Sequence, residues 1–287
     1  MAANFTASDD YVRIRVAGWR LRMRRNLHEV SEPMPPDITH FDGVRGPFQK
    51  IPASDYARVF KGSLNISGRL HHFYLKQYLY RSAWDFAKHV FRPGRAMRSF
   101  KATLLLTRNG LSAPEVIAVG EERRLLFCTR SFVITSSLRR ALPLYLWLGR
   151  LAPDDPRSRR KRRALLRRLG RTIGRMHSLN ISHGDLRPGN ILASEVGGNW
   201  TFNLLDNERT RLHRNLPHSM RIKNLVQIGM LHEEYLSQTD RTRFFTAYIN
   251  ASGRLKPSER ELARIVHQTT MKRLRSKPHV PMNAISD

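Results

Sequence analysis

Three polar residues in the second half of the chain have the types and the spacing that phosphoryl transfer requires. Asp185 and Asn190 are separated by four residues, two of which are Pro188 and Gly189, so one loop presents both. Asp206 ends an apolar stretch farther along the chain. The reaction needs a carboxylate that orients the attacking hydroxyl and oxygen ligands that hold Mg2+ against the phosphates. Asp185 is the candidate for the first role, and Asn190 and Asp206 for the second.

A lysine earlier in the chain adds the positive charge that ATP phosphates need. Lys76 lies in residues 71–80, where apolar and polar side chains alternate as in a strand. Kinases place such a lysine on a strand and follow it with Asp-x-x-x-x-Asn and then a metal-binding Asp, which is the order found here. A His-Gly-Asp turn or a strand lysine is commonplace when it occurs alone, so the combination supports the prediction. ATP and Mg2+ are the expected cofactors.

These residues need a scaffold, and the chain divides into three stretches. Residues 1–53 are basic and rich in proline and are expected to form an N-terminal extension. Residues 54–131 contain short alternating segments, which predict a small antiparallel N-lobe with one helix. Residues 132–287 are mainly helical in pattern and contain the catalytic loop 183–192 and the metal segment 204–209. The expected fold class is therefore α+β, with a two-lobed protein-kinase-like architecture.

Local signals give more detailed expectations. In the N-lobe, Gly, Ser and Asn in residues 62–68 and the Gly-Glu-Glu-Arg of residues 120–123 predict turns. In the helical lobe, an apolar stripe predicts a helix over residues 156–179, whose opposite face is almost entirely arginine. Further helices are expected over residues 220–250 and 256–275.

The composition limits the partners. The 287 residues include 51 Lys and Arg against 23 Asp and Glu, a formal net charge of +28. Such a positive field favours polyanions, namely nucleic acid, an anionic membrane or a phosphorylated substrate. The single cysteine, Cys128, excludes a disulfide framework and any zinc site built from several cysteines. No stretch approaches the roughly 18–20 apolar residues that a membrane-spanning helix needs.

Additional motifs surround the catalytic residues. They are Phe73-Tyr74-Leu75-Lys76, the Phe-Arg-Pro-Gly-Arg-Ala of residues 91–96, the Leu-Ser-Ala-Pro-Glu of residues 111–115, His183-Gly184-Asp185-Leu186 with Asn190-Ile191-Leu192, the segment Leu205-Asp206-Asn207-Glu208-Arg209, and Phe244-Phe245 with Tyr248. In these motifs, over about residues 55–250, the sequence resembles the lipopolysaccharide core kinases, which phosphorylate Kdo or heptose sugars. The catalytic loop is shared with kinases generally, whereas the Asp-x-x-Arg of residues 206–209 is similar to that family's magnesium segment.

The resemblance implies a role for each matching residue. Lys76 would pair with the phosphates of ATP, and Asp185 would be the catalytic carboxylate. Asn190 and Asp206 would bind Mg2+, in agreement with the roles that the residue chemistry suggests. Arg209 would lie near acidic groups of the substrate.

Three other residues are candidates that each have a second interpretation. Gly62 and Gly68 bracket the segment in which a kinase phosphate loop would lie, but the segment lacks the G-x-G-x-x-G pattern, and a hairpin turn explains these glycines equally well. Arg187 is either an ordinary loop residue or a contact to a substrate phosphate. The candidate cofactor-binding residues are therefore Lys76, Gly62, Gly68 and Asn190.

One feature of active kinases is missing from the sequence. Kinases pair the strand lysine with a glutamate on the following helix, and residues 95–109 contain no acidic side chain. Asp85 and Glu115 are possible substitutes, and nothing in the sequence selects between them. A non-catalytic kinase-like protein that binds anionic lipid or nucleic acid therefore stays open as an alternative.

The expected function is phosphotransfer from ATP to an alcohol, a sugar hydroxyl of the lipopolysaccharide inner core on Kdo or heptose. The expected partners are this anionic glycolipid and the anionic inner-membrane surface. The protein would then be cytoplasmic and peripheral on the cytoplasmic face of the membrane, with the arginine face of residues 156–179 as a contact. Nucleic acid is not expected, because no aromatic-interleaved RNA module or zinc-finger spacing is present.

Two other kinase functions stay open. A kinase of another small molecule, such as an amino-alcohol or an antibiotic, uses the same scaffold, although cationic acceptors favour an acidic pocket and this chain is basic. A kinase of protein substrates is the second, but no Ala-Pro-Glu-like element follows Asp206, and Asp-Asn-Glu replaces Asp-Phe-Gly. The sequence makes no prediction of the oligomeric state.

Overall fold

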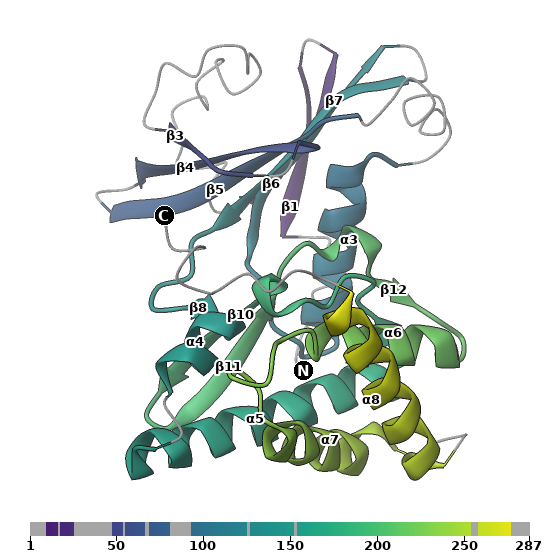
Figure 1. Ribbon diagram of the computed structural model, residues 1–287. Coiled ribbons are helices and arrows are strands. Elements are labelled where there is room, and N and C mark those ends of the chain that lie inside the picture. The colour runs from purple at the N-terminus through teal and green to yellow at the C-terminus, as the bar shows by residue number, and fades with distance from the viewer. Residues whose placement is uncertain are drawn as a thin grey trace, which may run out of the picture. The chain divides into compact units, whose positions relative to one another are not determined.

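The chain forms two compact units (Figure 1). The first comprises Met1–Leu104 and Pro114–Leu138, and the second comprises Leu105–Ala113 and Arg139–Asp287. The computed structural model describes residues 10–16, 18–25, 48–53, 55–66, 69–80, 93–124, 127–151, 154–253 and 258–276. The division after Leu138 differs from the boundary at residue 131 expected from the sequence, because a strand of the first unit continues through that position.

The described part of the first unit is built on a seven-stranded sheet with the strand order β1-β2-β6-β7-β5-β4-β3, in which every adjacent pair is antiparallel. Its strands are β1 (Tyr11–Val16), β2 (Trp19–Arg24), β3 (Phe48–Ile51), β4 (Ala57–Ile66), β5 (Arg69–Tyr78), β6 (Val116–Arg124) and β7 (Phe127–Ser136). The expected antiparallel sheet in this part of the chain is confirmed.

The expected extension at residues 1–53 contributes three of these strands, which corrects the sequence prediction. In β2, for example, arginines alternate with Trp19, Leu21 and Met23. Trp19 and Met23 are buried while Arg20 is exposed, as the two-residue period of a strand requires. The high arginine content concealed a strand pattern that is nevertheless regular.

The two segments expected to form turns in this unit are wholly or partly strand. β4 continues through Gly62, which lies opposite Phe73 in the middle of a ten-residue strand, so the expected turn at 62–68 is shorter than predicted. Gly68 lies outside the described residues. The expected turn at 120–123 is part of β6, where the buried Glu121 and Glu122 are neutralised by arginines of the same hairpin. These ion pairs allow acidic residues to occupy a strand interior.

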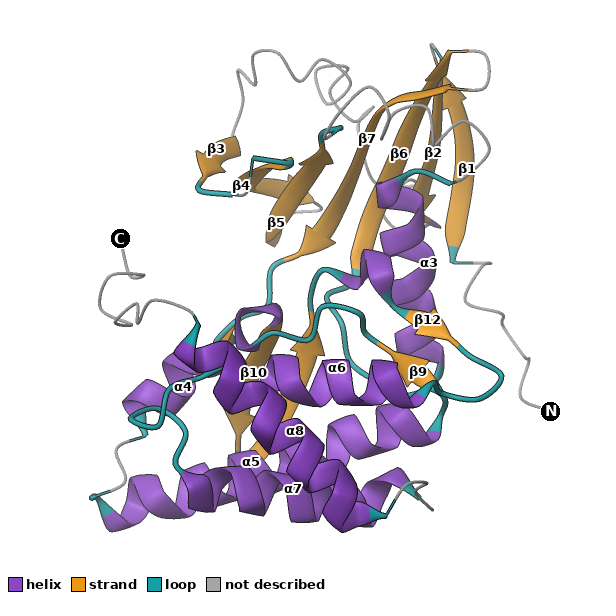
Figure 2. Ribbon diagram, turned by 45° about the vertical axis from the view of Figure 1, so that its right-hand side comes forward, coloured by secondary structure: helices purple, strands orange, loops and turns teal. Residues whose placement is uncertain are grey.

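Helix α3 (Arg95–Arg108) begins after Pro93-Gly94, as expected, and covers one face of the sheet (Figure 2). Ala96 and Phe100 pack there against Val119 and Val133. The opposite face has its own apolar cluster, formed by Trp19, Phe60, Phe73, Leu75, Ala118, Phe132 and Ile134. The two clusters explain how a sheet so rich in arginine is stable, because apolar side chains are buried on both of its faces.

The second unit is mainly helical, as expected. Its helices are α4 (Leu144–Arg150), α5 (Pro156–Ser178), α6 (His218–Ile228), α7 (Gln238–Ser252) and α8 (Glu259–Arg275). Short strands β8 (Leu142–Pro143), β10 (Ile191–Val196) and β11 (Asn199–Leu204) form one sheet, and β9 (Ile181–Ser182) pairs with β12 (Arg211–Leu212). None of the helices in the described ranges is long and apolar enough to cross a membrane.

The α5 helix confirms the predicted apolar stripe, but the helix expected over residues 220–250 is interrupted. Leu165, Leu169 and Ile173 of α5 are buried in the core of the unit. The interruption falls between α6 and α7, where Ser237 begins α7 by accepting a hydrogen bond from the backbone N–H of Asp240. A Ser followed three residues later by an acidic residue is a helix-start signal, and it lies inside the range predicted as one helix.

Helices α5 and α7 approach each other closely through two glycines of α5. A Cβ atom on Gly174 would lie 2.5 Å from the carbonyl oxygen of Tyr248, and one on Gly170 would collide with the carbonyl of Phe244. Neither contact involves a flexible side-chain end that could move away. The spacing of four residues places both glycines on the face that meets α7.

We expect Gly174→Ala to lower the free energy of unfolding by about 1–3 kcal/mol, because overpacking outweighs the gain of about 1 kcal/mol in helix propensity. Urea unfolding monitored by circular dichroism measures the change. Thr172→Ala, on the same helix, is the control and should alter stability by less than about 0.5 kcal/mol. A Gly174→Ala protein as stable as the wild type would contradict the close helix contact.

Candidate active site

The loop that contains Asp185 is fixed by its buried neighbours. Leu186 is fully buried in the core of the second unit, and Pro188, which begins the short 3-10 turn η2 (Pro188–Asn190), is also buried. Gly184 has a φ angle of +78°, and a Cβ atom there would lie 2.8 Å from both the Cβ atom and the carbonyl oxygen of Arg209. A glycine is therefore required at position 184, where the catalytic loop contacts the metal segment.

The carboxylate of Asp185 accepts hydrogen bonds from two side chains. The Arg187 guanidinium donates through Nε to Oδ1 over 2.7 Å and through its second nitrogen to Oδ2 over 3.3 Å. Gln227 of α6 donates to Oδ1 over 3.2 Å. The Asp185 side chain is 19% exposed, so it is accessible but not freely mobile. A carboxylate held in this way can accept a proton from an attacking hydroxyl.

Asn190 and Asp206 lie at the same end of the β10–β11 hairpin. Ile191 pairs with Leu204, and one step farther the carbonyl of Asn190 accepts a hydrogen bond from the N–H of Leu205 over 2.9 Å. The Asn190 side chain donates to the backbone carbonyl of Asp185 over 2.9 Å. The hairpin register and this bond therefore bring the three sequence-predicted residues Asp185, Asn190 and Asp206 together.

Asp206 has a left-handed backbone conformation, with φ 54° and ψ 47°, and its side chain is exposed. Residues other than glycine adopt this region rarely, and aspartate is among those that tolerate it. The residues that follow, in the 3-10 turn η3 (Asn207–Arg209), are held against the catalytic loop. Left-handed residues held by their surroundings are frequent at functional sites.

His183 connects the catalytic loop to the metal segment. Its buried ring lies with Nε2 3.0 Å from the Asn207 side-chain oxygen, while Nδ1 is 3.4 Å from the N–H of Asp185. The neutral tautomer protonated at Nε2 satisfies both contacts, because Nε2 donates and Nδ1 accepts. Burial lowers the pKa of His183, which favours this neutral form.

A second buried histidine supports the loop through Asn224, and sequence reasoning did not identify either residue. His177 of α5 lies with Nδ1 3.0 Å from the Tyr248 hydroxyl and Nε2 3.2 Å from the side-chain oxygen of Asn224. The same Asn224 oxygen accepts the N–H of His183 over 3.1 Å. The only available signal was an asparagine next to Leu225 and Val226, which are core residues of α6.

We expect the protein to lose stability on acidification because of His177. Burial lowers the pKa of His177 from 6.5 to about 3. Its folded-state pKa is thus below the unfolded value, so the unfolded chain binds more protons as the pH falls through 6.5. Between about pH 7 and pH 5 the linkage relation gives a loss of about 2 kcal/mol of unfolding free energy.

Urea unfolding at a series of pH values measures this dependence. His177→Gln should flatten the curve over that interval, whereas His267→Gln, at an exposed histidine of α8, should leave the slope unchanged. Equal slopes for the wild type and His177→Gln would contradict the role assigned to burial.

Lys76 and Gly62 belong to the first unit. Lys76, on β5, pairs with Val133 of β7, which belongs to the cluster under α3, so Lys76 lies on the face that α3 covers. Its ammonium is 5.4 Å from the centre of the Tyr78 ring. Gly62 is a buried strand residue of β4.

The buried acid found on the same sheet face as Lys76 is not one of those considered in the sequence. Glu115 forms an ion pair with Arg24, and Asp85 lies outside the described residues. A buried acid on the α3-covered face is Glu121, two residues after Val119 on β6, and its carboxylate is 3.3 Å from Arg123. A Cβ atom on Gly94 would lie 2.5 Å from a Glu121 carboxylate oxygen. The Glu121 side chain therefore packs directly against the backbone that precedes α3.

The two arginines named as substrate contacts are both accessible. The Arg187 side chain is 65% exposed although it is paired with Asp185. The Arg209 side chain is 50% exposed, and its Nε atom is 3.8 Å from Glu208. Both therefore can meet a ligand at the surface without a rearrangement of the core.

The chemistry of the Asn190 and Asp206 side chains fits Mg2+ better than a transition metal. The described ranges contain no group of three or more His, Cys, Asp or Glu that could hold a metal ion. Mg2+ commonly uses one or two protein oxygens together with substrate phosphates and water, so it needs no such group. Asn190 and Asp206 can supply these oxygens.

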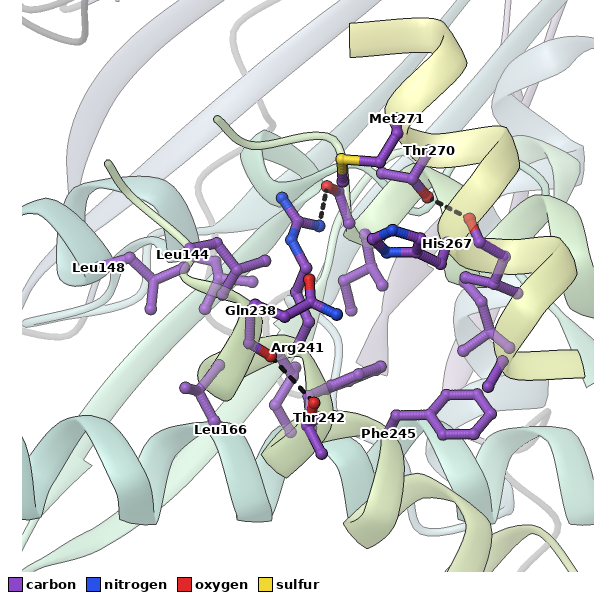
Figure 3. A pocket seen from close by; sticks show the side chains of 18 residues that line it. Leu144, Leu148, Leu166, Gln238, Arg241, Thr242, Phe245, His267, Thr270 and Met271 are labelled. Atoms are coloured by element: carbon purple, nitrogen blue, oxygen red, sulfur yellow. Dashed lines mark hydrogen bonds between the residues drawn. The ribbon is translucent and has the colours of Figure 1, made fainter. Parts of the chain in front are cut away.

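A separate cavity of about 200 Å³ lies among the helices of the second unit (Figure 3). Its walls are mainly apolar, with Leu144, Leu166 and Phe245 among them, and Arg241 crosses it to donate to the carbonyl of Gly229 over 2.8 Å. None of the residues that line it is acidic, and none belongs to the catalytic loop or the metal segment. The residues predicted to carry out the chemistry therefore do not line this cavity.

Comparison with known proteins agrees with the geometry. The sequence matches the family described as "Lipopolysaccharide kinase (Kdo/WaaP) family" over residues 53–248, more than half of the chain. A solved structure, "WaaP in complex with acyl carrier protein", superimposes with a TM-score of 0.59 at 18% identity, covering 79% of this chain and 88% of that one. None of the curated proteins compared matches the sequence. With a kinase-like fold and a family match that spans both units, this chain belongs to the Kdo/WaaP lipopolysaccharide kinase family.

Proposed function

We propose that the protein transfers the γ-phosphoryl group of ATP to a sugar hydroxyl, on Kdo or heptose, of the lipopolysaccharide inner core. Family membership supports the kinase activity and the class of acceptor. The observation that most directly supports retained catalysis is the arrangement of Asp185, Asn190 and Asp206 at one end of the β10–β11 hairpin.

In the proposed mechanism, Asp185 orients the acceptor hydroxyl and receives its proton. The hydroxyl oxygen forms a bond to the γ-phosphorus while the bond from that phosphorus to the β-γ bridging oxygen breaks, so ADP leaves. Asn190 and Asp206 would hold Mg2+, and the ion would supply neutralisation of the charge on the phosphates. Catalysis is mainly positioning and electrostatic stabilisation, as in other kinases.

The remaining site residues bind the two substrates. Lys76 pairs with the phosphates of ATP, and Gly62 belongs to the strand that would border them. Arg187 and Arg209, both accessible, contact acidic groups of the acceptor or the transferred phosphate. Arginine suits this task because its planar fork matches phosphate and carboxylate oxygens.

The experiment that tests this proposal offers one panel of acceptors with labelled ATP and Mg2+. The panel contains inner-core lipid without phosphate on its sugars, an aminoglycoside, and a mixture of protein substrates. We expect label on the core lipid alone. Label only on the aminoglycoside or the proteins would assign the chain to another kinase class, and label on none of them would favour a non-catalytic binder.

The arginine face of α5 is the proposed contact with the anionic cytoplasmic face of the inner membrane. The helix contains no acidic residue, and its exposed arginines are Arg157, Arg159, Arg160, Arg163, Arg167, Arg168, Arg171 and Arg175. Mutual repulsion among these charges destabilises the isolated face, and anionic lipid relieves it. Each basic residue near such a surface contributes about 1 kcal/mol.

We expect the triple substitution Arg159→Gln, Arg163→Gln and Arg167→Gln to weaken binding to anionic vesicles by about 3 kcal/mol, or roughly 100-fold. Co-sedimentation with phosphatidylglycerol vesicles at low salt measures it.

The matched control replaces Lys272, Arg273 and Arg275, exposed at the end of α8, with glutamine. It removes the same charge from a different surface. Equal losses in the two triple variants would show that net charge, not the α5 face, determines binding.

A further inference from the structure

We propose that Gln227 is a positioning residue, which orients the catalytic carboxylate of Asp185 from helix α6 and selects the oxygen that accepts the proton. This inference rests on the proposed function of Asp185. Gln227 lies forty-two positions after Asp185 in the sequence and in no motif named above.

Gln227 contacts the catalytic loop with both ends of its amide group. Its nitrogen donates to Oδ1 of Asp185 over 3.2 Å, and its oxygen accepts the N–H of Leu186 over 3.0 Å. One side chain therefore holds both the carboxylate and the backbone next to it. A bond to each end also fixes the orientation of the amide plane, because a flipped amide would lose both contacts.

The helix that presents Gln227 is itself firmly held. Asn224, one turn earlier on α6, is fully buried, accepts the N–H of His183, and has its side-chain nitrogen 3.4 Å from the Gln227 oxygen. Leu225, which lies between these two residues in the sequence, and Ile228, which follows Gln227, are buried in the core. Gln227 thus fixes the Asp185 carboxylate relative to the packed core of the unit. A side chain that is not anchored in the core could not do so.

The second donor to Asp185 is less constrained. Arg187 is 65% exposed and is attached to the same loop as Asp185, so it moves with that loop and is not anchored in the core. Without Gln227, the ion pair could rotate as a unit, because no other side chain from outside the loop donates to the Asp185 carboxylate within the described part of the chain. Positioning catalytic groups to a fraction of an ångström has a large effect on rate.

The geometry also distinguishes the two oxygens of Asp185. Oδ1 accepts from both Arg187 Nε, at 2.7 Å, and Gln227, at 3.2 Å, whereas Oδ2 accepts a longer hydrogen bond from Arg187, at 3.3 Å. An oxygen with two donors has both of its lone-pair directions engaged. Oδ2 is therefore the oxygen that receives the hydroxyl proton.

Two substitutions separate the two bonds of Gln227. Gln227→Glu keeps an oxygen that can accept the N–H of Leu186 but replaces the donor to Asp185 with a negative oxygen. Gln227→Met has a similar shape and loses both bonds. Gln268→Glu and Gln268→Met, at an exposed glutamine of α8, are the matched controls.

Two readouts are measured on the full chain. Transfer to core lipid gives kcat and the KM for ATP, and hydrogen exchange of the Leu186 amide reports how firmly the loop is held. We expect kcat to fall about 10- to 100-fold in both Gln227 variants with an unchanged KM for ATP, as loss of a hydrogen bond to a charged group implies. The Leu186 amide should exchange faster in Gln227→Met and at the wild-type rate in Gln227→Glu. The Gln268 variants should match the wild type in both.

The outcomes are decisive in each case. Wild-type kcat in Gln227→Glu would overturn the positioning of the carboxylate, and wild-type exchange in Gln227→Met would overturn the hold on the loop. Faster exchange in Gln227→Glu would mean that the loop as a whole is disturbed, which would also overturn the assignment. If the wild-type chain transfers no phosphate, the proposed function fails, while the comparison of exchange in Gln227→Met and Gln268→Met still tests the contact.

Discussion

Replacing Asp185 with alanine is expected to lower phosphoryl transfer about 100- to 10,000-fold, the usual contribution of a positioned general base. The carboxylate is accessible and accepts hydrogen bonds from Arg187 and Gln227. Asp185 is the acidic residue of the loop 183–192, so no other acid of that loop can replace it. Binding of ATP with Mg2+ should persist, because the residues assigned to it, Lys76, Asn190 and Asp206, are unchanged. Radiometric transfer to core lipid measures the first effect, and calorimetric titration with ATP and Mg2+ the second.

The control is Asp154→Ala, which removes an exposed carboxylate of the same unit and should leave transfer unchanged. Asp185→Asn refines the test, because the amide retains the shape of the side chain but cannot take up the proton. Turnover near the wild-type rate in both Asp185 variants would contradict the mechanism.

Replacing Arg162 with methionine is expected to lower the free energy of unfolding by about 3–5 kcal/mol, the usual cost of removing one partner of a buried ion pair. Arg162 is the buried member of the arginine-rich α5 helix. It donates to Asp240 over 2.8 Å and to the carbonyls of Leu148, over 2.7 Å, and Tyr235. The substitution leaves these acceptors buried without their donor, although Asp240 keeps its contact with Arg243.

The next residue provides a control for Arg162. Arg163 is exposed, and Arg163→Met removes the same charge from the same turn of α5. Its effect on urea unfolding should be within about 0.5 kcal/mol. Equal stabilities of the two variants would mean that the Arg162 network contributes little to the fold.

The sequence predicted the elements whose pattern is local. The apolar stripe of α5, the start of α3 after Pro93-Gly94, and the loop from Asp185 to Asn190 all depend on residues within a few turns of one another. The antiparallel sheet was also predicted, because alternation along a strand is a local property.

What the sequence did not predict depends on partners far away in the chain. Glu121 and Glu122 were expected in a turn, because a carboxylate in a buried strand is tolerated only when neighbouring arginines neutralise it. The strands β1 and β2 were hidden by their arginines, although their alternation is regular. These errors have one origin, since a strand interior in this protein contains more charge than usual.

The residues that hold the catalytic loop in place were also not predictable from local sequence patterns. Asp185 and Asn190 were identifiable from their spacing, but Asn224 and Gln227 acquire their roles only when α6 packs under the loop. A polar residue at a core position of a helix was the available signal. Such a buried polar residue indicates that it has a hydrogen-bond partner. It does not identify the partner, because the partner comes from another part of the chain.

The most direct test of the central claim is transfer of labelled γ-phosphate from ATP to purified inner-core lipid, with the wild type and Asp185→Ala compared in the presence of Mg2+ and of a chelator. We expect the wild type to label the lipid only when Mg2+ is present, and Asp185→Ala to label it at least about 100-fold more slowly. Labelling that is equal in the two proteins, or none by the wild type, would contradict the account.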